Sequence, residues 1–191
     1  MSVLFIPMPR QLTRLLTRLL TRVSPAATAA LLIVGVAAAT ILGAYFFEYG
    51  LGFAPCPLCL EQRVPYYITV PLAALVAAGA LKEAPQPLIL SGLVLLAVLA
   101  LANAALGAFH AGVEWRLWPG PQDCTGPIEK LGSAADLLRQ MQSTSIVRCD
   151  EPAWRFLGLS LAGYNVLISL FLAAIAIWGL VAMEFGRTPR P

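Results

Sequence analysis

The most reactive pattern in this chain is a pair of cysteines separated by two residues, Cys56-Pro57-Leu58-Cys59, with Arg63 one helical turn further on. Two thiols at this spacing can close a small disulfide, and reopening it yields a thiolate whose pKa depends on nearby positive charge and helix N-termini. Arg63 would supply such a charge. A helix that begins near Cys59 would add its first-turn N–H groups. The pattern therefore predicts a redox site.

Zinc and haem are the main chemical alternatives for this pair. The other two cysteines, Cys124 and Cys149, are too far apart in the sequence to form a second zinc knuckle. Leu60 stands where the c-type haem motif requires histidine. We therefore predict no metal at Cys56 and Cys59.

A purely structural role is the other alternative for each cysteine pair. So small a ring as Cys56–Cys59 removes little loop entropy, and its closure adds little stability. Cys124 and Cys149 have 24 residues between them, and a disulfide there would staple a sizeable loop. The second pair is consistent with either a redox or a structural bridge.

The composition is that of a membrane protein. Of its 191 residues, 59% are hydrophobic and only 12% are charged, against roughly 25% charged residues in an ordinary soluble domain. A helix needs about 20 mostly apolar residues to cross a bilayer, and in lipid its backbone groups must be satisfied internally. Four runs that contain no Asp, Glu, Lys or Arg meet this need: residues 25–47, 64–81, 85–109 and 156–183. The predicted fold class is all-α, a four-transmembrane-helix bundle formed by residues 25–185.

An even number of spans puts both termini on one side of the membrane and the loops 48–63 and 110–155, with all four cysteines, on the other. Arginines crowd just ahead of the first span, which usually dominates orientation. They are Arg10, Arg14, Arg18 and Arg22. We therefore expect the basic segment 1–24 and the tail 186–191 to be cytoplasmic, the former as an interfacial helix or a disordered leader.

The second outer loop holds most of the polar chemistry. Apolar residues recur there at helical spacing, which indicates a short amphipathic helix on the membrane surface. They are Ile128, Leu131, Ala135 and Leu138. The single histidine, His110, lies where the third span meets this loop.

The net charge of +3 and the lack of a nucleic-acid motif argue against nucleic-acid binding.

Aromatic residues gather at the span ends. Such residues belong by default to interfacial belts, and some could line the pocket of a ring-shaped ligand. They are Tyr45, Phe46, Phe47, Tyr66, Tyr67, Trp115, Trp118 and Trp154.

The four cysteines allow three disulfide connectivities. Pairing of sequence neighbours, Cys56 with Cys59 and Cys124 with Cys149, leaves each outer loop its own disulfide and allows the two to exchange electrons. Disulfides persist in oxidising compartments such as the bacterial periplasm. We expect the cysteine loops to be periplasmic.

Beyond these patterns, the segment 55–63 resembles the disulfide bond formation protein B (DsbB) family. The segments 110–115, 118–124 and 149–159 resemble that family's segments in the same order. The resemblance extends from about Ala44 into the fourth span and leaves out the basic leader. It implies a thiol:quinone oxidoreductase of the bacterial inner membrane, in a system that keeps the periplasm oxidising.

For individual residues, the resemblance implies that a reduced DsbA-like protein with a thioredoxin fold attacks Cys124. Cys149 is then freed and attacks Cys56, which leaves Cys59 as a thiolate facing the cofactor. The electron acceptor would be ubiquinone or menaquinone, with Arg63 stabilising negative charge and His110 assisting at a quinone oxygen.

Two functions of other classes stay open at this point. One is a membrane carrier that delivers reducing equivalents to periplasmic thiols. The other is a non-enzymatic membrane scaffold stapled by its disulfides. Reduction of added quinone by the protein's thiols distinguishes the three.

Overall fold

The computed structural model describes residues 24–121 and 148–185. The arginine-rich leader, the amphipathic helix predicted around 128–138, Cys124 and the tail 186–191 lie outside these ranges and stay predictions.

The described chain is mostly helical. In order, it forms α2 (Pro25–Tyr45), a π-helical continuation η1 (Phe46–Gly50), α3 (Pro57–Glu61), α4 (Val64–Leu81), α5 (Gln86–Glu114), the strands β1 (Arg155–Phe156) and β2 (Leu159–Ser160), and α7 (Leu161–Phe185). Four helical segments are long and apolar enough to span a membrane: Pro25–Gly50, Pro57–Leu81, Gln86–Glu114 and Leu161–Phe185. The predicted fold class, a four-helix membrane protein, is confirmed.

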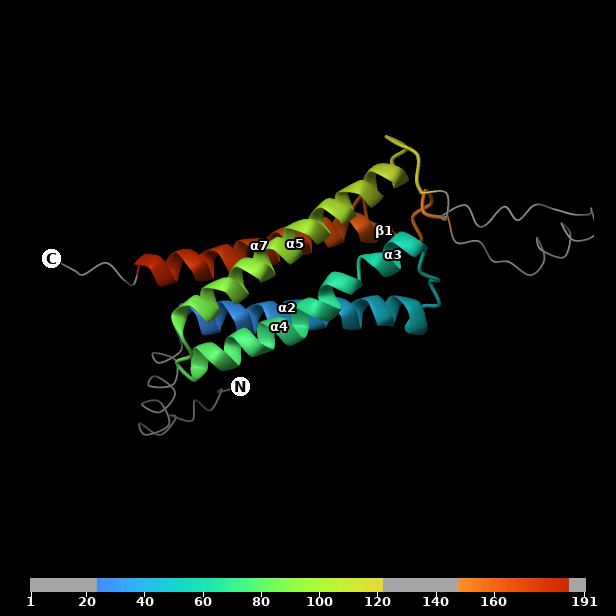
Figure 1. The fold of residues 1–191 in the computed structure, drawn as a ribbon. Helices are drawn as coiled ribbons and strands as arrows, with labels where there is room; N and C mark the ends of the chain where they lie inside the picture. Colours follow the sequence, from blue (N-terminus) through green and yellow to red (C-terminus); the bar gives the residue numbers. More distant parts are fainter. Residues whose placement is uncertain (1–23, 122–147, 186–191) are drawn as a thin grey trace, which may run out of the picture.

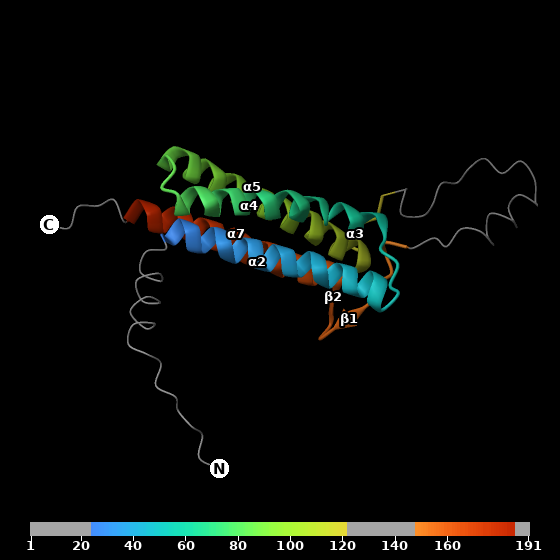
Figure 2. The same cartoon turned by 90° about the horizontal axis from the view of Figure 1, so that it is seen from below.

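The four long helices run side by side as a bundle (Figures 1 and 2). The main contacts of α2 are with α4 and α7, and those of α5 are with the same two helices. The start of α2, the hairpin between α4 and α5, and the end of α7 lie at one end of the bundle. The segment before α3, α3 itself and the β-hairpin lie at the opposite end. All described cysteines therefore belong to one end.

Small residues bring the helices together. The buried face of α2 is mostly alanine, at positions 26, 29, 30 and 37. A Cβ added to Gly179 on α7 would lie 2.8 Å from the Cβ of Ala29, and one added to Gly92 on α5 would lie 2.4 Å from a methyl of Val76. Close backbone approach of this kind is the usual basis of helix association in lipid, where the hydrophobic effect between helices is absent. Many large apolar side chains face outward, although Ile33, Leu93 and Leu96 are buried in the core.

Four predicted span boundaries differ clearly from the observed ones. The second spanning segment includes α3 and begins at Pro57 and not at 64. Helix α5 continues to Glu114, so His110 and its neighbours are helical, although the sequence placed them in the outer loop. The first span extends through η1 to Gly50. The fourth span begins at Leu161 and not at 156, because an antiparallel hairpin precedes it. Leu157 and Gly158 form its turn with φ of 49° and 83°, and a helix cannot contain this left-handed pair.

Candidate active site

Cys56 lies at the N-cap of α3, the short helix that leads into α4. Its Sγ accepts a hydrogen bond from the backbone N–H of Cys59 at 3.3 Å. Pro57 follows in the first turn, where its missing N–H is of no consequence. The sequence suggested a helix that begins near Cys59; α3 begins at Pro57, so Cys59 lies in its first turn and Cys56 is the N-cap. The backbone N–H therefore stabilises negative charge on Cys56.

The two sulfurs face each other as a dithiol. The Cys56 and Cys59 Sγ atoms are 3.0 Å apart and both thiols are free, whereas a disulfide bond measures about 2.05 Å. When Cys56 is the ionised sulfur, the Cys59 S–H is the donor between the two sulfurs, which are within hydrogen-bond distance. This hydrogen bond is the main reason why the pKa of Cys56 falls to about 5, and a further hydrogen bond from His110 adds to it. The predicted Cys56–Cys59 disulfide stays a prediction for the oxidised form.

Cys149 reaches this site from the second outer loop. It is disulfide-bonded and only 2% exposed. It packs in one buried cluster with Cys56, Leu58 and Val113, and Cys59 lies against the same cluster. The structure thus brings together three of the four predicted redox cysteines.

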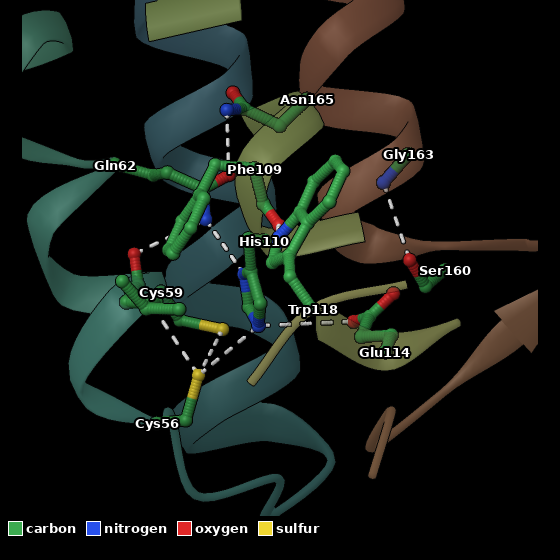
Figure 3. Close-up of polar contacts among 11 residues, drawn as sticks. Cys56, Cys59, Gln62, Phe109, His110, Glu114, Trp118, Ser160, Gly163 and Asn165 are labelled. Carbon is green, nitrogen blue, oxygen red and sulfur yellow. Dashed lines mark hydrogen bonds and ion pairs between the residues drawn. The ribbon is translucent and has the colours of Figure 1, made fainter. Parts of the chain in front are cut away.

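His110 lies behind Cys56, on α5. It is 2% exposed, and its Nε2 is 3.6 Å from the Cys56 Sγ. Its Nδ1 faces the side-chain nitrogen of Gln62 at 2.7 Å. Glu114, one turn further along α5, has a carboxylate oxygen 3.8 Å from the His110 Nε2. Figure 3 shows the imidazole between the Cys56 sulfur and the Gln62 amide.

Arg63 lies on the other side of the dithiol. Its guanidinium forms an ion pair with Glu48 of η1 and lies over the ring of Tyr45, with its central carbon 5.5 Å from the ring centroid. The Arg63 side chain is 12% exposed. Because the counter-ion Glu48 fixes one face of the guanidinium, the arginine is held in one place and is not a freely snorkelling anchor.

A cavity of about 650 Å³ opens beside Cys59 and Arg63. Residues of α2, η1, α4 and α7 line it, and its walls are mainly apolar. Its polar lining includes Glu48, Gln62 and Asn165. This size and mixture of surfaces is typical of small-molecule sites. Within the described chain, the lining residues include Cys59 and Arg63 of the predicted cofactor set but not His110.

Aromatic rings form part of the cavity wall. The ring centroids of Phe47 and Trp154 are 5.1 Å apart. The Trp154 ring stacks on the Phe156 ring with a centroid distance of 5.7 Å and an angle of 9° between the planes. All three line the cavity. Part of the predicted interfacial belt therefore forms a flat-walled pocket that suits a planar ring.

A buried polar network continues from Gln62 into the bundle. The Asn165 amide nitrogen donates to the Gln62 Oε1 at 2.7 Å, and the Asn165 Oδ1 accepts from the Tyr66 hydroxyl at 2.7 Å. Asn103 and Ser169 complete the network. The Asn103 Oδ1 has no hydrogen-bond partner among the described residues. The paired atoms of the network hold one another in single orientations.

Cys56, Cys59 and His110 are also a possible metal-binding group. Their ligand atoms all lie within 4.8 Å of one another. A structural zinc site needs four such ligands. This group of described residues supplies three ligands, one fewer than such a site needs. Metal analysis of the purified protein tests the metal alternative.

Several functional residues were not identified from the sequence. Glu48 was assigned to a loop, Gln62 was passed over between Glu61 and Arg63, and Asn165 was counted as part of an apolar span. A signal was available, because a polar side chain inside or at the edge of a membrane span generally has a partner or a function.

Comparison with known proteins identifies the class. The chain matches the family model described as disulfide bond formation protein DsbB over residues 26–179. Disulfide bond formation protein B 2 of Pseudomonas entomophila is 34% identical over 155 residues, which is 78% of this chain and 87% of the relative. Disulfide bond formation protein B of Hahella chejuensis is 30% identical over 162 residues, 81% of this chain and 91% of the relative. An uncharacterized protein of Rickettsia prowazekii is 29% identical over 146 residues, 74% of this chain and 80% of the relative.

The fold and the dithiol define a multi-pass membrane protein with a disulfide-forming oxidoreductase site. The chain belongs to the DsbB family of disulfide bond formation proteins.

Proposed function

We propose that this protein reoxidises a periplasmic DsbA-like dithiol protein and passes the electrons to a membrane quinone, ubiquinone or menaquinone, in the bacterial inner membrane. One observation carries the proposal. Cys59 lines an apolar cavity beside Arg63, whereas its redox partner Cys56 packs beside the disulfide-bonded Cys149. The dithiol thus touches a second cysteine pair on one side and a ligand-sized space on the other.

The first step is thiol–disulfide exchange at the second pair. A thiolate of the reduced partner attacks Cys124 of the Cys124–Cys149 disulfide and releases Cys149 as a thiolate. The second thiol of the partner then attacks the mixed disulfide, so the partner leaves oxidised and both cysteines are reduced. Each attack breaks one S–S bond and forms one, so two electrons enter the protein.

The second step moves these electrons to the first pair. Cys149 attacks Cys56 of the Cys56–Cys59 disulfide and Cys59 leaves as a thiolate. Cys124 then attacks Cys149, which restores the second disulfide and releases Cys56. Packing of Cys149 against Cys56 supports this order.

In the last step the pair returns to a disulfide and gives up two electrons and the Cys59 proton, and the second proton is the one that Cys56 has already released to solvent. A quinone would accept the two electrons and two protons and would leave as hydroquinone. Cys59 would present its sulfur at the cavity wall, and Arg63 would stabilise negative charge that develops on a ring oxygen. Phe47 and Trp154 would provide flat walls for the ring, and the lipid-facing bundle suits an acceptor that is dissolved in the bilayer.

Anaerobic mixing tests this function. Reduced DsbA-like protein, the purified membrane protein and quinone are combined, and the quinone absorbance is followed. We expect one quinone reduced for each partner dithiol oxidised. Failure of quinone to oxidise the pre-reduced protein would point to a disulfide-stapled scaffold. Reduction of the oxidised protein by hydroquinone, with electrons moving on to the partner, would point to a reducing carrier.

The orientation is tested separately. The arginine cluster ahead of α2 predicts that the cysteine end of the bundle faces the periplasm. A membrane-impermeant thiol reagent should label a cysteine introduced at Gly120 in spheroplasts and should leave one introduced at Glu83 unlabelled until the membrane is opened. The reverse pattern would place the site in the cytosol and would end the proposal.

A further inference from the structure

Gln62 has no part in the mechanism above, yet it is 5% exposed and contacts His110 directly. We propose that Gln62 is a positioning residue that fixes His110 in one neutral tautomer, with the proton on Nε2, so that the imidazole donates to Cys56 and stabilises negative charge on that sulfur. The inference deepens the proposed function, since it rests on Cys56 and Cys59 as the pair that exchanges electrons.

The orientation of the Gln62 amide follows from its fixed neighbours. The Gln62 Nε2 lies 3.1 Å from the backbone carbonyl of Leu58, and a carbonyl oxygen can only accept, so the amide nitrogen must be on this side. The Gln62 Oε1 lies 2.7 Å from the amide nitrogen of Asn165, which donates to it. The flipped amide would lose the first of these bonds and turn the second into a clash of two donors.

The tautomer of His110 follows from that orientation. The amide nitrogen of Gln62 carries two protons, of which one goes to Leu58 and the other points at the His110 Nδ1, 2.7 Å away. Because this amide group can only donate, Nδ1 must accept and carries no proton. A neutral imidazole then carries its proton on Nε2. In a doubly protonated imidazolium, the same contact would place two N–H donors against each other.

The Nε2–H of His110 faces the dithiol. The Cys56 Sγ is 3.6 Å away, within the range of a hydrogen bond to sulfur. The nearer oxygen of Glu114 is 3.8 Å away, beyond ordinary hydrogen-bond range. Figure 3 shows the whole path, from Asn165 through Gln62 and His110 to Cys56.

The groups that act on Cys56 fall into two kinds. When Cys56 is ionised, the Cys59 S–H, the Cys59 backbone N–H and the His110 Nε2–H all donate to its sulfur. The Glu114 carboxylate, if ionised, opposes a negative charge at this position. Three donors on one sulfur stabilise the reduced, thiolate form, and a pair whose reduced form is stabilised is the more oxidising. Gln62 thereby helps the Cys56–Cys59 disulfide to accept electrons from Cys149.

The tautomer is directly measurable because His110 is the only histidine in the chain. Nitrogen NMR of ¹⁵N-histidine-labelled full-length protein, purified through a histidine-free tag and kept reduced in micelles, reports the protonation of each ring nitrogen. We expect Nε2 to carry the proton and Nδ1 to be bare near neutral pH. A proton on Nδ1, alone or together with Nε2, would overturn the proposal.

Replacement of Gln62 tests the cause. In Gln62→Glu, a carboxylate takes the place of the donor and can only accept, so the proton should move to Nδ1. The same substitution at Gln86, which lies at the other end of the bundle, is the matched control and should leave the spectrum unchanged. An unchanged His110 spectrum in Gln62→Glu would show that something else fixes the tautomer.

Gln62→Met, which keeps the volume and removes the amide, gives a second measurement. The ionisation of Cys56 is followed by the ultraviolet absorbance of its thiolate, with Cys56→Ser as the reference. Loss of the fixed Nε2–H donor should move the midpoint upward by about one pH unit. An unmoved midpoint would count against the proposal. Neither measurement uses quinone or a partner protein, so failure of the proposed function and failure of this inference are separate results.

Discussion

The two cysteines of one short motif occupy very different surroundings. Cys56 is 4% exposed, accepts hydrogen bonds from Cys59 and His110, and packs against Cys149. Cys59 is half-buried and lines the cavity that Arg63 and the aromatic residues share with it. Three residues of sequence thus separate a sulfur that faces another cysteine from a sulfur that faces a ligand-sized space.

The comparison shows how a dithiol is made directional. If both sulfurs had equal surroundings, either could be attacked by the second pair and either could face the cofactor. Here α5 supplies one hydrogen-bond donor, His110, to Cys56 alone. The start of α4 and η1 place Arg63 and Glu48 on the side of Cys59. We therefore expect changes at the two sulfurs to affect different half-reactions.

The largest effect is expected from Cys59→Ser. Loss of the sulfur at the cavity wall should lower quinone reduction by at least about 100-fold. A single round of exchange between the partner and the Cys124–Cys149 disulfide should persist. The rate is measured anaerobically by quinone absorbance and the exchange by trapping the mixed disulfide. Turnover at the wild-type rate would show that electrons leave the protein elsewhere.

The ionisation of Cys56 provides the next test. With a pKa of about 5, the thiol is ionised at pH 7 and its thiolate fraction falls to about a tenth at pH 4. The sign follows from the lowered pKa, since the thiolate is present above the midpoint and is lost as the pH falls through it. The thiolate absorbance of the reduced protein, with Cys56→Ser subtracted, gives the midpoint. A midpoint near that of an ordinary thiol, about 8.5, would remove the distinction between the two sulfurs.

Arg63→Ala should weaken the use of quinone at Cys59 and leave the thiol–disulfide exchange at Cys56 unchanged. We expect the apparent KM for quinone to rise about fivefold, because the positive charge beside the cavity is lost. Both disulfides should still form. Lys82→Ala, which removes a basic residue at the far end of α4, is the matched control. An unchanged KM in Arg63→Ala would leave the arginine with a structural role only.

The sequence predicted the four helices, which the structure confirms, and a redox role for Cys56 and Cys59, which stays a prediction. Both rest on local signals, namely uncharged runs and a C-x-x-C spacing. The hairpin before α7 was missed because the apolar residues of 156–160 are as compatible with a span as with a turn. Only the left-handed backbone at Leu157 and Gly158 decides between them. Span boundaries in apolar sequence depend on such local geometry.

The family resemblance implied different roles for the two sulfurs, but the contacts that distinguish them could not be predicted from the sequence. His110 lies 54 positions after Cys56, and its place behind that sulfur depends on how α5 crosses α3 and α4. His110 is not among the residues that line the cavity. The expected contact of His110 with a quinone oxygen stays a prediction. The pairing of Arg63 with Glu48 likewise depends on the extension of α2 through η1. Contacts between segments follow from packing, which local patterns do not encode.

The smallest effect is expected from Glu48→Gln. This substitution tests whether Glu48 acts on the quinone site through Arg63. The neutral side chain keeps a weaker hydrogen bond to Arg63 but loses the ion pair, so the guanidinium is held less firmly and the KM for quinone should rise about twofold. Glu83→Gln, at the opposite end of the bundle, is the control and should change nothing. In an Arg63→Ala background, Glu48→Gln should have no further effect, because its influence passes through the arginine. Additive effects of the two substitutions would instead show that Glu48 contacts the ligand by itself.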